Sequence, residues 1–246
     1  EAERPPSALS RDDLEVRDRA GGVRAFSAGD ALLRARRALE RLGVEVACRP
    51  LGHDAPERLL AIECPYFDTQ ATPRFSASAQ LILPVMRTNC YGKGTTAEQA
   101  ECSALFEWIE RHLSAWRGDK DLVTASYREV RDRAIDVPFL ASGLLPGLPL
   151  SNTRPFDEDE PLDFVWGHCL RTGRAILLPA ASVFMCPTLF RGSLVELPAA
   201  GSSGLSAGCS FADALLQGLL ELVERDACHT ALRNACPFPQ IDAGSI

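Results

Sequence analysis

The chain has 246 residues, of which 46% are hydrophobic and 24% charged, and its net charge is -7 at pH 7. This composition is typical of a soluble globular protein with one large domain or two small ones. The acidic balance excludes a general nucleic-acid-binding surface. No apolar run reaches the roughly 18 residues of a membrane-spanning helix. We therefore expect neither nucleic acid nor a membrane as a partner.

The N-terminus and the cysteines indicate the compartment. The polar N-terminal sequence EAERPPSALSRDD lacks the apolar core of a signal peptide, and it starts without Met, so we expect the first natural residues to be missing. The nine cysteines are odd in number and include no CxxC pair, which argues against a disulfide framework and a zinc site. Reduced thiols in the cytoplasm are the simplest interpretation. Cys228 beside His229 is an alternative nucleophile–base pair, although adjacent residues on a helix point in different directions.

The first part of the chain predicts an α/β unit. Residues 1–22 are polar and predict a flexible arm or a short edge element. Residues 29–43 predict an amphipathic helix that ends at Gly43. Its basic face is solvated in the simpler interpretation and contacts phosphate or a partner in the alternative; it carries Arg34, Arg36, Arg37 and Arg41. Strands are predicted over 44–51, 59–66 and 81–87. The run NCYGKG, 89–94, predicts a tight loop in which Lys93 either meets a phosphate or lies in solvent.

The second part of the chain begins and ends with long helical patterns. Residues 97–116 predict a helix whose apolar side, including Leu113, lies in the core. Residues 117–162 are rich in proline and predict little regular structure. The sequence DFVWGHCLRTGRAILLPA predicts a β-hairpin, with a third strand beginning at 183–185. A glycine-punctuated loop and a helix follow over 204–233.

The loop–helix unit occurs twice. GLSAGCSFADALLQGLLELVERD, 204–226, is echoed by GTTAEQAECSALFEWIERH, 94–112. A shift of 114 positions places Gly94 on Gly208, Ala100 on Ala214, Ser103 on Gln217, Glu107 on Glu221, Glu110 on Glu224 and Arg111 on Arg225. Such a match predicts an internal repeat.

The repeated carboxylates predict a metal and phosphate site. In each copy the two glutamates share one helix face, behind a loop that can offer backbone N–H groups. If these faces meet, four carboxylates would repel one another unless cations lay between them. Two Mg²⁺ ions carrying a polyphosphate would satisfy that arrangement. The alternative is a pair of solvated helix faces, because ExxER occurs on many surface helices.

Both motifs resemble segments of one family. GKGTTAEQAECSALFEWIERH is similar to the GKG…A..SAL.E.IER segment of the YcaO family, and GSSGLSAGCSFADALLQGLLELVERDA to its SNGLAAGN…EA…GLLELIERDA segment. Between them, FVWGHCLRTGRAILLPA resembles the family's WvxGxdLxTGxxxlvP strand pair. The resemblance implies a mixed α/β (α+β) fold with antiparallel sheets flanked by helices. It implies an N-terminal arm over 1–22 and a YcaO-like ATP-binding domain over 23–246 that lacks its C-terminal part.

The resemblance also implies an activity. YcaO proteins use ATP to phosphorylate the oxygen of a peptide backbone amide after a nucleophile adds to its carbonyl. A Cys, Ser or Thr nucleophile gives an azoline, sulfide gives a thioamide, and an amine gives an amidine. Azoline formation in ribosomal peptide natural-product biosynthesis is our first expectation. The implied partners are a ribosomally made precursor peptide and a separate leader-binding, E1-like or TfuA-like protein, with a homodimer as a further expectation.

The resemblance assigns residues to the cofactors ATP and Mg²⁺ and assigns none to covalent catalysis. The implied ATP contacts are Arg24, Ala100, Ser103, Ser206, Cys209, Gln217 and Arg225, joined by Lys93 from its loop. The implied metal ligands are Glu107, Glu110, Asp213, Glu221 and Glu224.

Four positions depart from the family pattern, and they leave a second hypothesis open. Cys209 and Ser203 replace Asn, Asp213 replaces Glu, and Ala31 replaces a hydroxyl residue. Together these changes leave room for a degenerate ATP site. Cys209, Ala31 and the expected lack of a C-terminal part favour the alternative of a non-catalytic scaffold that binds a peptide or a partner enzyme. A different kinase or ligase is a third alternative, but the chain has no GxxxxGK[ST] motif.

Overall fold

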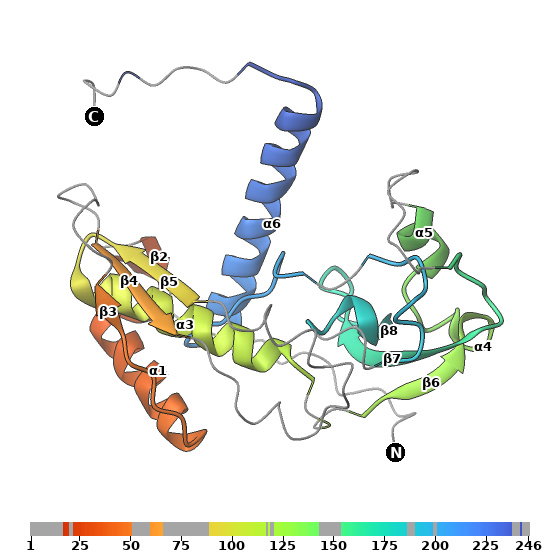
Figure 1. Cartoon of the computed structure of the whole chain (residues 1–246), viewed down its shortest axis with the longest axis horizontal. Coiled ribbons are helices and arrows are strands. Elements are labelled where there is room, and N and C mark those ends of the chain that lie inside the picture. Colours follow the sequence, from red (N-terminus) through yellow and green to blue (C-terminus); the bar gives the residue numbers. More distant parts are fainter. Residues whose placement is uncertain are drawn as a thin grey trace.

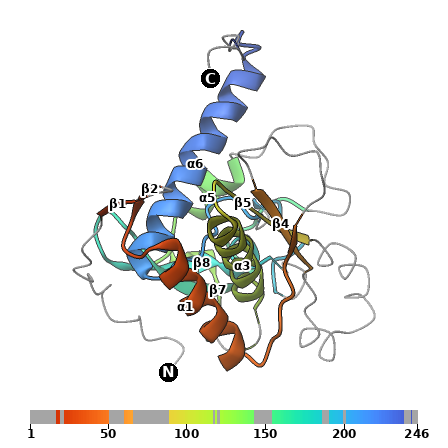
Figure 2. The same cartoon turned by 90° about the vertical axis from the view of Figure 1, so that its left-hand side faces the viewer.

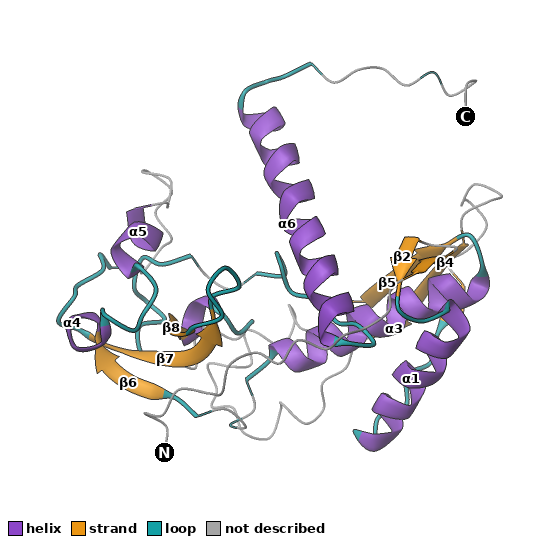
Figure 3. Cartoon of the chain, turned by 180° about the vertical axis from the view of Figure 1, so that it is seen from behind, coloured by secondary structure: helices purple, strands orange, loops and turns teal. Residues whose placement is uncertain are grey.

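The computed structural model describes residues 17–19, 22–50, 60–65, 89–116, 118, 121–142, 154–185, 190–198, 201–237 and 242. Two α/β units lie at opposite ends of the molecule, and one long helix projects away from both (Figure 1). The view from behind shows the same separation of the two sheets (Figure 3). Most of the predicted arm and the predicted strand 81–87 lie outside the described residues.

The first unit packs two helices on a sheet. Strand β4 pairs with β3 on one side and with β5 on the other, both antiparallel. Helix α3 packs on β5 and β4, and α1 packs on α3 (Figure 2). The elements are β3 (Arg49–Pro50), β4 (Leu60–Pro65), β5 (Asn89–Gly94), α1 (Ala28–Arg41) and α3 (Ala97–Ser114). A short hairpin, β1 (Arg17–Arg19) with β2 (Gly22–Arg24), precedes them.

Local signals explain both helices. Ser27 caps α1 by accepting a hydrogen bond from the Asp30 N–H at 3.2 Å, and Gly43 follows the helix with a φ of +67°. The predicted helix 29–43 is therefore confirmed within two residues. The apolar sides of α1 and α3 meet in a core of Ala35, Leu39, Cys90, Ala100, Ala104, Leu105, Trp108 and Ile109. We expected Leu113 in that core, but its side chain is 62% exposed and lies outside it.

Two predictions for this unit were wrong. Residues 89–94 form strand β5 and not a loop, because their backbone pairs residue by residue with β4, from Leu60 opposite Gly94 to Pro65 opposite Asn89. A complete ladder overrides the low strand propensity of glycine. Within the predicted strand 44–51, the structure gives only Arg49–Pro50 as a strand.

The second unit is a three-stranded sheet in the order β6–β7–β8. The predicted hairpin is confirmed, with His168 opposite Ala175 and Gly173 at a φ of +69° in the turn. The elements are β6 (Val123–Ser126), α4 (Tyr127–Val130), α5 (Val137–Ser142), β7 (Pro161–His168), β8 (Ala175–Pro179) and η3 (Ala180–Ser182). Its core contains Val123, Tyr127, Val130, Val137, Leu162, Phe164, Leu177, Val195 and Leu197.

The third strand of this sheet comes from the stretch that predicted little regular structure. β6 pairs with β7, whereas residues 183–185 form a turn and a bend. Buried Asp163 on β7 fixes the pairing, because its carboxylate accepts hydrogen bonds from Thr124 Oγ1 at 2.7 Å and from the Arg191 N–H at 2.8 Å. A buried carboxylate satisfied by two donors ties β6 and a distant loop to β7.

Helix α6 (Phe211–Arg233) begins beside the first unit and then extends away from the rest of the molecule (Figures 1 and 2). Gly218 is its only buried residue, and apolar side chains such as Val223 at 67% exposure face outward. Of the two acidic helices, only α3 buries an apolar side here. No helix in the described part of the chain is long and apolar enough to cross a membrane.

Candidate functional site

The first acidic motif is held by a strand and a helix that contact each other closely. Thr96 caps α3 by accepting from the Gln99 N–H at 3.2 Å. About three turns after this cap, Glu107 accepts a hydrogen bond from the Tyr91 N–H of β5 at 2.7 Å. Its other oxygen pairs with Arg111 at 3.2 Å. The carboxylate therefore ties the strand to the helix and already has a positive neighbour.

The second acidic motif makes a parallel set of contacts. Ser210 caps α6 by accepting from the Asp213 N–H at 3.1 Å. Glu221 accepts from the Gly204 N–H at 2.8 Å and pairs with Arg225 at 2.8 Å. The cap, the carboxylate and the arginine lie 114 positions after Thr96, Glu107 and Arg111, the spacing of the sequence repeat.

Glycines let each loop approach its helix. A Cβ on Gly94 would lie 2.5 Å from Gln99 Cβ, and one on Gly208 would lie 2.6 Å from the Ala214 nitrogen. Each glycine therefore permits its chain to pass over the first turn of the following helix. This close approach explains why the repeated motif begins with glycine in both copies.

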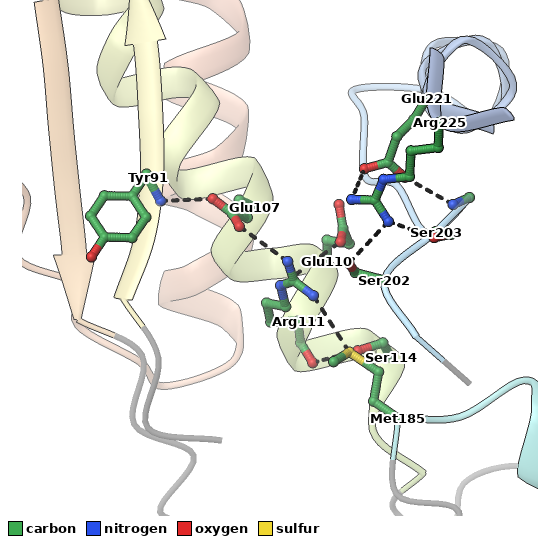
Figure 4. A network of polar contacts seen from close by, with 11 residues as sticks. Tyr91, Glu107, Glu110, Arg111, Ser114, Met185, Ser202, Ser203, Glu221 and Arg225 are labelled. Carbon is green, nitrogen blue, oxygen red and sulfur yellow. Dashed lines mark hydrogen bonds and ion pairs between the residues drawn. The ribbon is translucent and has the colours of Figure 1, made fainter. Parts of the chain in front are cut away.

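The carboxylates of the two motifs approach each other at Glu110 (Figure 4). Burial raises the pKa of Glu110 from 4.5 to about 7; Arg111 lowers it, the Glu221 and Glu107 carboxylates raise it, and Arg225 lowers it. Three of the four repeated glutamates therefore share one electrostatic environment. Glu224 is exposed and takes no part in the polar network of Figure 4, so the structure does not place all four together.

A cavity of about 680 Å³ lies between α1, α3, the end of β5 and the loop before α6. Seven predicted site residues line it, together with Ala31: Lys93, Ser103, Glu107, Glu110, Cys209, Asp213 and Gln217. Its apolar wall includes Phe26 and Phe106, and its polar wall includes Thr95 and Gln99. This volume and mixture of walls are typical of a small-molecule site.

Other predicted site residues lie behind this cavity or beside it. Ala100 is fully buried under β5, and Ser206 donates a hydrogen bond to the Ala214 carbonyl. Arg225 donates to Ser203 Oγ at 2.6 Å in addition to pairing with Glu221. Arg24 lies in β2, and its side chain is outside the described part of the structure.

Sequence reasoning missed several residues of the cavity wall. Phe26 precedes α1, and Tyr91, Thr95, Gln99, Cys102 and Phe106 come from β5 and the first half of α3. Gln99 and Phe106 could have been found, because they lie four residues before Ser103 and Glu110 on the same helix. No sequence signal identified Phe26, since its place in the wall depends on how α1 packs on α3.

The donor chemistry fits magnesium carried by phosphate better than a metal cage made by protein alone. Within the described residues, no group of three or more His, Cys, Asp or Glu side chains forms a metal site. Mg²⁺ in phosphate sites takes one or two carboxylates and completes its shell with waters and phosphate oxygens. Glu107 and Glu110 on the cavity wall, with Glu221 nearby, supply such carboxylates. Only two arginines, Arg111 and Arg225, accompany these three carboxylates, so negative charge remains for a cation to neutralise.

One buried thiol, Cys90, and one half-buried thiol, Cys209, give a prediction for labelling. Burial and then Glu107 raise the pKa of Cys90 to about 12, and burial and then Asp213 raise the pKa of Cys209 to about 11. Because the thiolate is the reactive form, iodoacetamide at pH 8 should label exposed Cys228 and Cys236 well before either. Labelling of Cys209 should rise about tenfold per pH unit up to pH 10. Peptide mass spectrometry measures each rate, and equal rates for Cys90 and Cys228 in folded protein would contradict the structure.

Two solved structures share the fold. A heterocyclase in complex with substrate and cofactor superposes with a TM-score of 0.72 and 22% identity, covering 98% of this chain and 33% of the heterocyclase. The YcaO protein of Methanopyrus kandleri bound with AMPPCP and Mg²⁺ superposes with a TM-score of 0.58 and 24% identity, covering 91% of this chain and 50% of that protein. At this identity the likeness shows the fold, and the predicted mixed α/β class is confirmed.

Sequence comparison gives the family. The family model described as YcaO cyclodehydratase, ATP- and Mg²⁺-binding, matches residues 91–246, which include both acidic motifs. The chain belongs to the YcaO family, and the cofactors predicted for it, ATP and Mg²⁺, are those of the family. An uncharacterized protein of Methanothermobacter thermautotrophicus is 29% identical over 158 residues, which are 61% of this chain and 36% of that protein. The chain thus spans between a third and a half of the length of the relatives that it matches.

Proposed function

We propose that this chain binds Mg-ATP in the cavity between α1 and α3 and takes part in the phosphorylation of a peptide backbone amide, with azoline formation as the expected outcome. One observation carries the proposal. Half-buried Glu110 lies at the edge of a nucleotide-sized cavity and is close to two other carboxylates, Glu107 and Glu221, each of which is paired with an arginine. When bound, ATP supplies the phosphoryl group and Mg²⁺ neutralises its charge. An amide oxygen becomes a leaving group only when it is phosphorylated.

The residues of the chain then have the following roles. Glu107, Glu110 and Asp213 on the cavity wall, with Glu221 beside it, would hold Mg²⁺. Lys93 is exposed on the same wall and can place its ammonium group against a phosphate oxygen. Phe26 and Phe106 offer apolar surface for a planar base. Phosphoryl transfer needs positioning and charge neutralisation more than a covalent catalyst, so we assign no nucleophile.

The test follows ADP and peptide mass together. The protein is incubated with Mg-ATP, a Cys-, Ser- and Thr-rich precursor peptide and a leader-binding partner of the E1-like or TfuA-like class. We expect ADP release and loss of one water per modified residue. Replacement of oxygen by sulfur, with added sulfide, would assign the thioamide-forming alternative instead. No ADP and no mass change would contradict the proposal.

A non-catalytic scaffold is the second candidate, and one observation favours it. Glu107 and Glu221 each use one oxygen for a backbone N–H and the other for an arginine, so both already act as braces between a loop and a helix. A scaffold needs only these braces. It would bind a peptide or a partner enzyme with an affinity that Mg-ATP does not change.

A further inference from the structure

A second groove lies along α1, next to the cavity. Its volume is about 540 Å³, and Phe26 lines both hollows. Three arginines line the groove, Arg34, Arg37 and Arg41. They follow one another at three and then four residues, so they share one face of the helix.

The arginines of the groove are available to a ligand. Arg34 lies with its guanidinium 4.0 Å from the centre of the Phe26 ring. Arg37 and Arg41 are exposed, and neither forms an ion pair with another described residue. Arg36, one position away, differs because it pairs with Glu101 of α3. Among the described residues, no carboxylate forms an ion pair with an arginine of the groove, and Asp30 is the one acidic residue that lines it.

The shape of the groove indicates which anion it fits. Arg34 and Arg41 are seven residues apart, about 10 Å along a helix. A single phosphate needs positive groups that converge on one point, whereas these are spread along a line. Apolar Leu33 and Phe26 lie among them. A line of guanidinium groups matches an extended peptide in which every second residue is acidic, because alternate side chains of an extended chain share one face and lie about 6.6 Å apart.

We propose that the groove on α1 binds an acidic segment of the peptide substrate and holds the peptide beside the nucleotide cavity. This inference rests on the proposed function, because it takes the substrate to be a peptide. Phe26 lines both the groove and the cavity, so the two hollows adjoin. A peptide that lies on Arg37 and Arg41 can therefore continue into the cavity, where phosphoryl transfer would take place. The groove then provides the affinity for the peptide, and the cavity holds the Mg-ATP that phosphorylates it.

The experiment measures peptide binding without ATP. The probe is a fluorescein-labelled peptide of alternating Glu and Leu, followed by fluorescence anisotropy at low salt. The double variant Arg37→Ala/Arg41→Ala should raise its Kd by about tenfold or more. The matched control Arg36→Ala removes an arginine from the same helix outside the groove and should leave the Kd within about twofold. Arg37→Lys/Arg41→Lys keeps the charge and should retain most of the binding.

Several outcomes overturn the inference. They are equal affinity of the double variant and the wild type, equal affinity for a peptide with Gln at every Glu, and tighter binding of a single-stranded oligonucleotide than of the acidic peptide. Circular dichroism of each variant checks that α1 is intact. A separate Mg-ATP titration keeps the two proposals apart, because wild-type protein that binds the peptide but not Mg-ATP contradicts the proposed function and leaves the groove in place.

Discussion

The variant Glu107→Gln is expected to bind Mg-ATP about a hundredfold more weakly than the wild type while keeping its fold. Glutamine is isosteric with glutamate, and its side-chain oxygen can still accept the hydrogen bond of the Tyr91 N–H. The negative charge that would bind Mg²⁺ is lost, and so is the ion pair with Arg111. Glu221→Gln should behave in the same way, since Glu221 has the same two kinds of partner. Isothermal titration calorimetry with Mg-ATP measures both.

The control for this prediction is Glu101→Gln. Glu101 lies on α3 as well, but it pairs with Arg36 and does not line the cavity. Its replacement removes an equal charge from the same helix and should change the Kd for Mg-ATP by less than about twofold. Unchanged binding in both Glu107→Gln and Glu221→Gln would make these residues braces only, and the scaffold would become the better account of the chain.

Local sequence patterns predicted the elements whose start, apolar face and end are all marked by residues within or next to the element. The helix over 29–43 has an apolar stripe, a serine that caps it and a glycine that ends it, so its limits follow from neighbouring residues. The hairpin of β7 and β8 has two apolar runs around a Gly-containing turn. The shift of 114 positions that aligns the two motifs also relates Thr96 to Ser210, and the structure has both residues as helix caps.

Elements that depend on distant partners could not be predicted in this way. The sequence of residues 89–94 is typical of a loop, because four of its six positions, Asn89, Gly92, Lys93 and Gly94, are glycine or polar and give no sign of the pairing with β4. Residues 123–126 form strand β6 because their backbone pairs with β7 and Thr124 donates a hydrogen bond to Asp163. Nothing within 123–126 itself predicts that partner. The cavity wall at Phe26 depends on the packing of α1 on α3. The hydrophobic periodicity of a sequence predicts single helices and strands. A site between elements depends on their long-range packing, which periodicity does not predict.

The largest loss of stability is expected from Gly92→Ala in strand β5. A Cβ at this position would lie 2.0 Å from the Ala100 carbonyl oxygen and 2.3 Å from the Ala104 nitrogen. Both are backbone atoms of α3, so no side chain can rotate away, and the strand must separate from the helix. Buried Trp108 would then lose its packing against the sheet. We expect the free energy of unfolding to fall by about 3 kcal/mol or more.

Gly201→Ala is the matched control, because no heavy atom lies within 4 Å of the Cβ it would add. Urea denaturation should give it a free energy of unfolding within about 0.5 kcal/mol of the wild type. An equally small effect of Gly92→Ala would mean that β5 does not lie against α3 as the structure has it.

The second motif places its glycine on the other element. Shifted by 114 positions, Gly92 and Ala104 become Ser206 and Gly218, so the glycine is on strand β5 in the first copy and on the helix in the second. At Gly218 an added Cβ would lie 2.8 Å from the Gly204 carbonyl oxygen, so here the helix needs the glycine. In the first copy, Ala104→Gly would remove only the contact of the added Cβ with Ala104 Cβ at 2.8 Å and would leave both backbone contacts in place. The double variant Gly92→Ala/Ala104→Gly should therefore be no more stable than Gly92→Ala, because glycine within a helix itself costs about 1 kcal/mol. A double-mutant cycle in urea measures this, and recovery of most of the lost stability would contradict the backbone contact of β5 with α3.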